Sequence, residues 1–444
     1  MKNSVKTTAV IEFGTSKVIV MVAQSTAKRI GSDYFEIIGA GIVSYDGFEE
    51  RSWLNREKLD SVIEEAIKTA QTDAKVIIDS IYVGVPGDFI HVSSQEHGIR
   101  LTDDNGKALI VEKDIARFMD EAAEKLDLAN EGGHVLHRSP AWYRIDNGKR
   151  TMMVVNSRGK DLTGEISFIQ ADPDFVEEIR SILLKLGIQV EAFLSPSLGM
   201  SQYLIDFAER DRHPCVLIDT GYRSCEISVC EGDAITAHLM LPIGGCDITD
   251  HLIEEFGIDR NSAERIKREC KLNPEDYEKA AAPSVLMPGG HMAQLDKGDV
   301  HEVIDEKMRE IADYIRQAFD YIEGGLDASA KVYMTGGGVC PMNGAAAYFA
   351  RELDRPVKLV KPKGCTNYED YEYSSAVGLV DMVFNILDGI EGIEGIEDTS
   401  DAENGGSDRE NEDSGFADEK PKAAKTAKKA PKKDSKPGFK SLFG

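Results

Sequence analysis

The chain has 444 residues, 41% of them apolar and 29% charged, a composition typical of soluble globular proteins. This length exceeds what one hydrophobic core usually supports, so two or more lobes are expected. The formal net charge of −26 argues against nucleic acid as a partner. Seven cysteines without a C-x2-C pair indicate reduced thiols and argue against a zinc site.

Neither a membrane span nor a leader is expected from the hydrophobicity pattern. The sequence contains no run of eighteen apolar residues, the length that a transmembrane helix needs. The apolar stretch near the start is broken by Glu12, Gly14 and Lys17, which does not fit a signal peptide.

The first elements predicted along the chain form an α/β layout. Residues 7–23 alternate apolar and polar side chains around Gly14-Thr15-Ser16, which predicts a hairpin with a short turn. A third strand is expected within 35–48, a helix over 55–74 from its apolar spacing, and a strand over 79–88. Parallel pairing is possible in such an arrangement.

Residues 86–165 have a different character and predict a small α+β insert. One helix is expected over 112–128, among short strands such as 134–146. After the insert, the pattern predicts a strand, a helix, a strand and a helix. Asp172 and Pro173 suit the N-cap and first turn of the first of these helices.

A second hairpin, predicted over 215–229, repeats the first about two hundred residues later and suggests two related lobes. Helices are then expected over 251–270 and near 300–323, a strand, glycine turn, helix and strand over 330–360, and an apolar helix over 373–387. The predicted domains are a first lobe of residues 1–85 and 166–210, on which the 373–388 helix packs back, an insert of residues 86–165, and a second lobe of residues 211–388.

The charge is unevenly placed beyond the second lobe. Residues 391–419 carry twelve acids and one arginine, whereas residues 420–444 carry nine lysines and one aspartate. Such biased composition is typical of disordered segments. We therefore expect an acidic linker over 389–419 and a basic, disordered tail over 420–444.

Three glycine-bearing turns follow predicted strands, at residues 12–17, 219–224 and 335–338. One such turn is weak evidence, because many turns need glycine for packing alone. Two hairpins followed by a glycine turn, in this order, are much stronger evidence for a phosphate site. Backbone N–H groups and hydroxyls of such turns surround phosphate oxygens, while a carboxylate at a strand end holds hydrated Mg²⁺.

The order of these three turns resembles the actin/Hsp70/sugar-kinase superfamily, and within it the FtsA family of bacterial cell division. The likeness covers about residues 7–381 and includes "EFGTSK", "GHVLHRSPAWYRID", "VLIDTGYRSCEISV", "LPIGGCDITDHL", "SAERIKRE", "TGGG" and "YSSAVGLV". It implies an actin-like two-lobed α/β fold with an FtsA-type inserted subdomain that contributes to contacts between protomers.

The same resemblance implies a role as an adaptor in cell division. A protomer of this family polymerises into filaments, binds the C-terminal tail of the tubulin-like FtsZ and works with other divisome proteins. A C-terminal amphipathic helix ties the filament to the cytoplasmic face of the cell membrane at the division site. The implied cofactor is ATP with Mg²⁺.

The resemblance also implies a set of nucleotide-binding residues. Glu264 and Lys267 match positions that face the purine and ribose, and Mg²⁺ would be held through Glu12 or Asp219. No catalytic residue is assigned. The full set is Glu12, Gly14, Thr15, Ser16, Lys17, Asp219, Gly221, Arg223, Ser224, Glu264, Lys267, Gly336, Gly337 and Gly338.

Several positions of this site depart from the family pattern. Glu12 stands where the first loop usually has Asp, and Tyr222 and Arg223 stand where the second loop usually has glycines, so a positive φ there would be costly. Ser195 precedes Pro196 where active ATPases of this fold often carry Glu or Gln. At most a weak ATPase is expected. Two interpretations remain open, a retained nucleotide site or a cleft filled by the two large side chains.

The end of the chain predicts membrane contact. Phe439, Leu442 and Phe443 lie at i, i+3 and i+4, one face of a helical turn, with Lys440 and eight further lysines nearby. Lysines attract anionic lipid, and buried apolar side chains add to the binding. The alternative is a solubilising tail without a membrane role.

Two other functions fit the same fold. A sugar or acid kinase would need a catalytic acid facing its substrate, and Asp247 and Asp250 are the candidates. A pilus-assembly adaptor shares the type of insert but not the basic and apolar tail.

Overall fold

The structure is a computed structural model that describes residues 5–26, 34–102, 106–125, 133–287, 289–322, 326 and 329–387. The predicted membrane-contact residues Phe439, Lys440, Leu442 and Phe443 lie outside the described residues, as do the predicted linker and basic tail. Among the described residues, no helix is long and apolar enough to cross a membrane.

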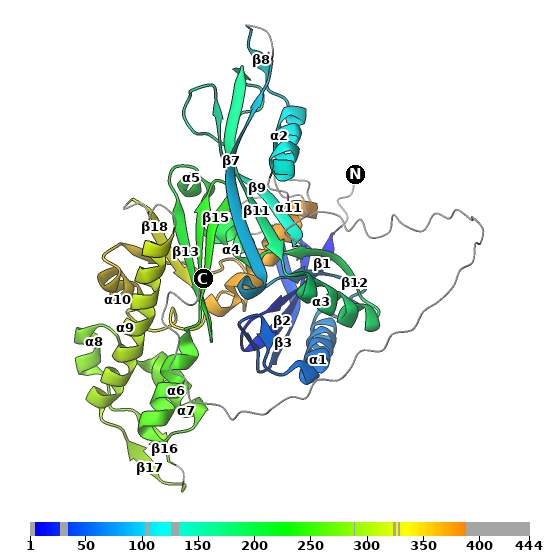
Figure 1. Cartoon of the computed structure of the whole chain (residues 1–444). Helices are drawn as coiled ribbons and strands as arrows, with labels where there is room; N and C mark the ends of the chain where they lie inside the picture. The colour runs from blue at the N-terminus through cyan, green and yellow to red at the C-terminus, as the bar shows by residue number, and fades with distance from the viewer. Residues whose placement is uncertain are drawn as a thin grey trace, which may run out of the picture. The chain divides into compact units, whose positions relative to one another are not determined.

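The first sheet has five strands in the order β12-β6-β1-β2-β3 (Figure 1). β1 and β2 form the predicted antiparallel hairpin, while β6 pairs with β1 and β12 in parallel. The strands are β1 (Thr7–Phe13), β2 (Lys17–Ser25), β3 (Phe35–Ser44), β6 (Ser80–Gly84) and β12 (Gln189–Leu194). A short pair, β4 (Phe48–Glu49) and β5 (Ser52–Trp53), follows β3.

Helices α1 (Arg56–Ala74) and α3 (Pro173–Lys185) belong to this sheet. The buried apolar residues of α1 follow the predicted helical spacing, and α1 packs against β3. Gly41 permits this contact, since a Cβ there would lie 1.9 Å from the carbonyl oxygen of Ala66. α3 starts as predicted, because the Asp172 side chain accepts a hydrogen bond from the Asp174 N–H and Pro173 opens the helix.

The second sheet also has five strands, in the order β15-β14-β13-β18-β19. It repeats the arrangement of the first, since the antiparallel hairpin β13-β14 lies beside the parallel strand β18. The strands are β13 (Cys215–Thr220), β14 (Cys225–Glu231), β15 (Ala234–Leu241), β18 (Lys331–Thr335) and β19 (Val357–Leu359).

Helices and a small hairpin accompany the second sheet. Helix α6 packs against both α7 and α9. The elements are α6 (Gly245–Phe256), α7 (Arg260–Glu269), α8 (Pro274–Lys279), α9 (Lys297–Tyr321), α10 (Ala345–Glu352), β16 (Ser284–Leu286) and β17 (Met292–Gln294).

A separate three-stranded antiparallel sheet, in the order β7-β11-β9, carries its own core around Phe118 and Phe168. Its strand β11 pairs with β7 along its whole length up to Ala171, so the sheet continues past residue 165, the predicted end of the insert. The elements are η1 (Gly87–Phe89), β7 (Ile90–Arg100), β8 (Ala108–Leu109), α2 (Glu112–Lys125), β9 (His134–Ile145), β10 (Arg158–Gly159) and β11 (Asp161–Ala171).

Helix α11 (Ser374–Leu387) links the two five-stranded sheets (Figure 1). It packs against β1 and β2, while Ser374 at its start lies 2.6 Å from the hydroxyl of Thr335 at the end of β18. Helix α4 (Pro196–Leu204) packs closely on it at Gly199 and Gly378. The short α5 (Phe207–Arg210) leads into β13, and η2 (Tyr371–Tyr373) leads into α11.

Candidate functional site

The two hairpin turns and the glycine turn line one cavity of about 130 Å³. Every residue of the predicted nucleotide set contributes to its wall except Arg223 and Ser224. Ser224 lines a second cavity of about 80 Å³, which shares Glu12, Gly14, Thr15 and Asp219 with the first. Three segments that are far apart in the sequence therefore meet where the resemblance expects a nucleotide.

The two hairpin turns have the same geometry and face each other. Gly14 N–H donates to the Lys17 carbonyl at 2.9 Å, and Gly221 N–H donates to the Ser224 carbonyl at 2.9 Å. Across the cleft, Arg223 N–H donates to Thr15 Oγ1 at 3.1 Å. Two backbone donors of the second turn, Gly221 N–H and Arg223 N–H, are thus used by the protein itself.

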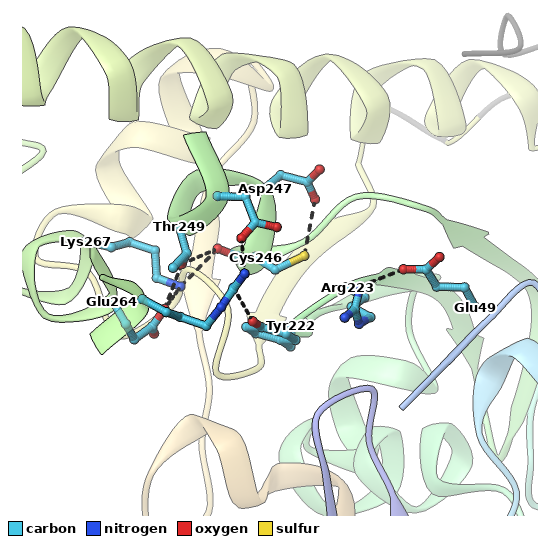
Figure 2. A network of polar contacts seen from close by, with 11 residues as sticks. Glu49, Tyr222, Arg223, Cys246, Asp247, Thr249, Glu264 and Lys267 are labelled. Atoms are coloured by element: carbon cyan, nitrogen blue, oxygen red, sulfur yellow. Dashed lines mark hydrogen bonds and ion pairs between the residues drawn. The ribbon is translucent and has the colours of Figure 1, made fainter. Parts of the chain in front are cut away.

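Tyr222 and Arg223 occupy the usual glycine positions without backbone strain. Neither appears among the described non-glycine residues that have positive φ, so the expected cost of a side chain there does not arise. The Tyr222 hydroxyl accepts a hydrogen bond from Arg260 at 2.7 Å, and Arg223 Nη1 donates to Glu49 at 2.7 Å (Figure 2). Both large side chains therefore have defined partners.

The glycines of the third turn allow close backbone packing. Gly336 has φ of +97°, and a Cβ there would lie 2.2 Å from Asp219 Oδ1. At Gly338, a Cβ would lie 2.2 Å from the Gly221 carbonyl oxygen, and its own N–H donates to Thr220 O at 2.7 Å. These two positions require glycine to seat the turn against the second hairpin, independently of any ligand.

Glu264 and Lys267 form an internal polar network on α7 (Figure 2). The Lys267 side chain is 1% exposed, and its Nζ lies 2.7 Å from Glu264 and donates to the Gly245 carbonyl at 3.0 Å. Burial lowers the pKa of Lys267, although Glu264 opposes this. Glu264 also accepts from Thr249 at 2.8 Å. Lys267 thus fixes α7 against the start of α6, and Glu264 presents the more exposed group to the cavity.

Glu12 and Asp219 lie at the ends of β1 and β13, beside the two hairpin turns. Burial raises the pKa of Glu12 to about 7 and that of Asp219 to about 8. Ser375 Oγ donates to Glu12 at 3.1 Å. A buried carboxylate, Glu12, and a partly exposed one, Asp219, lie next to phosphate-type turns and fit Mg²⁺, which commonly uses one or two carboxylates together with water and substrate phosphates. No cluster of three or more metal-binding side chains occurs within the described ranges.

Glu226 was not predicted as a site residue, although it ends the second loop. It lies in the wall of the second cavity, and its Oε1 receives hydrogen bonds from Ser197 and from His238 at 2.9 Å. Burial alone would raise its pKa, but these partners outweigh burial and lower it. The neighbouring Asp88 has its pKa raised to about 6 by burial and by Glu226.

Four other cavity residues were not predicted, although Arg268 and Ser375 lie inside strings that carry the family resemblance. Arg268 sits one turn beyond Glu264 and donates to it at 2.9 Å. Tyr371, Glu372 and Ser375 come from the segment that enters α11, and Glu372 pairs with Lys17 of the first turn. Nothing in that segment resembles a phosphate-binding motif. Its residues reach the cavity because α11 packs between the sheets.

Comparisons with known proteins agree with this geometry. The family model described as "Cell division protein FtsA" matches residues 216–378. The cell division protein FtsA of Escherichia coli (strain K12) is 24% identical over 386 residues, which cover 83% of this chain and 88% of that protein. FtsA of Pseudomonas aeruginosa (strain PAO1) is 25% identical over 379 residues, covering 83% and 87%. FtsA of Bacillus subtilis (strain 168) is 22% identical over 377 residues, covering 83% and 82%.

Among solved structures, a chain of the PilM-PilN type IV pilus biogenesis complex matches with a TM-score of 0.56 and 15% identity. The match covers 86% of this chain and 98% of that chain, which shows a shared fold. With its paired hairpins, its actin-like α/β fold and relatives that align over most of its length, this chain is similar to the FtsA cell-division proteins.

Proposed function

We propose that this chain is an actin-like adaptor of bacterial cell division. It binds ATP with Mg²⁺ between the two hairpin turns, assembles into filaments and binds the C-terminal tail of FtsZ. Its basic tail attaches these filaments to the cytoplasmic face of the membrane at the division site, where other divisome proteins join them. The observation that carries the proposal is the convergence of three phosphate-type turns on one cavity in a chain similar to the FtsA proteins.

The nucleotide part of the proposal rests on the geometry of the cleft. Glu12 and Asp219 would hold hydrated Mg²⁺, and the phosphates would bind N–H groups of the turns other than those of Gly14, Gly221 and Arg223, which donate to the protein itself. Gly337 and Glu264 border the side of the cavity that would take the ribose and base. The absence of Glu or Gln before Pro196 favours slow turnover or none, so the nucleotide would act in assembly.

Isothermal titration of the full chain with MgATP tests this part. Saturable binding is expected, and Asp219→Asn is expected to weaken the Mg²⁺-dependent component, because one carboxylate ligand is lost. Replacing Tyr222 and Arg223 with glycine is the control for the two large side chains. If neither the wild type nor the variant with glycine at positions 222 and 223 gives more heat than dilution alone, nucleotide binding is contradicted.

Two further measurements test the adaptor role. An FtsZ C-terminal tail peptide on beads is expected to retain the full chain. Deleting residues 439–444, or replacing Phe439 and Phe443 with Asp, is expected to release the protein from anionic liposomes in co-sedimentation. Equal co-sedimentation of the deleted chain would exclude the apolar tip as the anchor.

The kinase alternative finds less support in the contacts of its two candidate acids. The Asp247 carboxylate accepts a hydrogen bond from the Gly244 N–H at 2.9 Å and so caps the start of α6. Asp250 forms an ion pair with Arg260. An acid that already caps a helix or pairs with arginine is poorly placed to accept a proton from a sugar hydroxyl.

A further inference from the structure

The cleft contains a side-chain contact that connects the two sheets. Glu49 lies in β4, beside the first sheet, and Arg223 lies in the turn of the second sheet, 174 residues later in the chain. Arg223 makes two contacts to the first lobe. Its guanidinium donates to Glu49 at 2.7 Å, and its backbone N–H donates to Thr15 Oγ1 at 3.1 Å. Figure 2 shows the Arg223 side chain directed at Glu49.

The turn that carries Arg223 is also fixed on its own side. The Tyr222 hydroxyl accepts from Arg260 on α7, and the Tyr222 carbonyl accepts from the Cys246 N–H at 2.7 Å. These contacts hold the backbone of the turn in place, so the position from which the Arg223 side chain extends is fixed. The ion pair between Arg223 and Glu49 therefore restrains the distance between the two sheets.

The contacts of Arg223 lie beside the two cavities between the turns. The cavities of about 130 Å³ and about 80 Å³ share Thr15, whose Oγ1 accepts the hydrogen bond from the Arg223 N–H. Any separation of the two turns that admits a nucleotide would break the contacts of Arg223 to Glu49 and Thr15, so these contacts oppose the entry of a ligand.

We propose that Arg223 and Glu49 form a clasp that holds the cleft closed without a nucleotide and competes with an incoming phosphate for the guanidinium. In most two-lobed clefts, a ligand that touches both lobes selects the closed state. Here the Arg223–Glu49 ion pair and the Arg223–Thr15 hydrogen bond favour the closed state even without a ligand. Arg223 Nε is buried and has no hydrogen-bond partner among the described residues, so the closed clasp leaves this donor unsatisfied.

The expected strength of the clasp follows from its exposure. The side chains of Arg223 and Glu49 are 30% and 53% exposed, so the pair is partly screened by water. Ion pairs of this kind shift an equilibrium by about two- to fivefold, and the effect falls as salt rises. The clasp therefore biases the cleft toward closure and still lets a ligand open it.

Hydrogen exchange in the nucleotide-free full chain tests the clasp directly. Glu49→Gln and Arg223→Gln are expected to speed exchange about two- to fivefold at the turns 14–17 and 221–224, and to leave α9 unchanged as a check on folding. Glu50→Gln removes a neighbouring charge for which no contact to Arg223 occurs in the described structure, so it serves as the matched control. The double variant with Glu49→Arg and Arg223→Glu is expected to restore slow exchange.

Unchanged exchange at both turns in Glu49→Gln and Arg223→Gln would overturn the clasp, as would equal acceleration in Glu50→Gln. A second arm measures association of a fluorescent ATP analogue, which Glu49→Gln is expected to accelerate by a similar factor. This arm rests on the proposed function, whereas the exchange arm needs no nucleotide. Failure of the wild type to bind nucleotide would therefore count against the proposed function alone.

Discussion

Single residues in this chain show how burial fixes a protonation state. His137 on β9 is 2% exposed, and its Nε2 accepts a hydrogen bond from the Ser195 N–H at 2.9 Å, where α4 begins. Burial lowers its pKa from 6.5 to about 4, so the native imidazole is neutral near pH 7. The contact joins the three-stranded sheet to the helix that crosses toward the cleft.

Acid should therefore destabilise the protein through His137. The unfolded chain binds the proton below pH 6.5 and the native state only near pH 4, so this contribution is complete above pH 6.5 and is lost as the pH falls toward 4. Between pH 7 and pH 5 the loss is about 2 kcal/mol. Glu12 and Asp219, whose pKa values are raised, act in the opposite direction, so the quantity to measure is the difference between two proteins. We expect the unfolding free energy of His137→Gln relative to the wild type to rise by about 2 kcal/mol from pH 7 to pH 5 in urea denaturation. The exposed His91→Gln is the control, and an unchanged slope in His137→Gln would refute the assignment.

At the scale of helices and strands, two elements can pack closely where one of them carries a glycine, because glycine has no side chain. Gly41 on β3 faces α1, and a Cβ at this position would overlap the backbone of Ala66. Gly41→Ala should destabilise the first sheet by about 1–3 kcal/mol, because backbone atoms cannot move aside cheaply. Gly106→Ala, where a Cβ meets nothing within 4 Å, should be nearly neutral. Thermal unfolding of the two variants checks the difference, and equal midpoints would contradict it.

Most elements were predictable from local patterns because their signals lie in contiguous residues. The spacing of apolar residues in α1 and the Asp172-Pro173 cap of α3 are examples that the structure confirms. The strand β11 shows the limit of this approach. Its local sequence fits a strand, but its partners β7 and β9 are set by long-range pairing, so the sheet runs past residue 165.

The candidate site shows the same division between local and long-range information. The two hairpin turns and the TGGG turn have local glycine signals, and the structure brings them together around one cavity. Glu226 and Ser375 lie inside strings that carry the family resemblance but were not assigned to the site, and Asp88 reaches the second cavity only through packing of a distant segment. The conformation of Tyr222 was also unpredictable, because the family's glycines suggested a positive φ that this turn does not use.

At the scale of the whole molecule, a ligand that spans the cleft should stabilise both sheets together. A ligand at 100 times its dissociation constant adds about 2.7 kcal/mol to the free energy of unfolding. If phosphates contact both hairpin turns, MgADP should raise the melting temperature more than AMP at matched concentration, and MgATP at least as much as MgADP. Thermal unfolding monitored at the far-ultraviolet helix signal measures this order.

The dependence of this stabilisation on Mg²⁺ distinguishes the contribution of Asp219 from that of the opposite wall of the cavity. In Asp219→Asn, the increment from added Mg²⁺ should shrink, because the carboxylate at the end of β13 is lost while the wall formed by Glu264 and Gly337 remains. If the base and ribose bind this wall as proposed, AMP should stabilise the variant and the wild type alike. A variant that loses the AMP effect as well would show that Asp219 supports the cleft as a whole, since its carboxylate packs directly against Gly336.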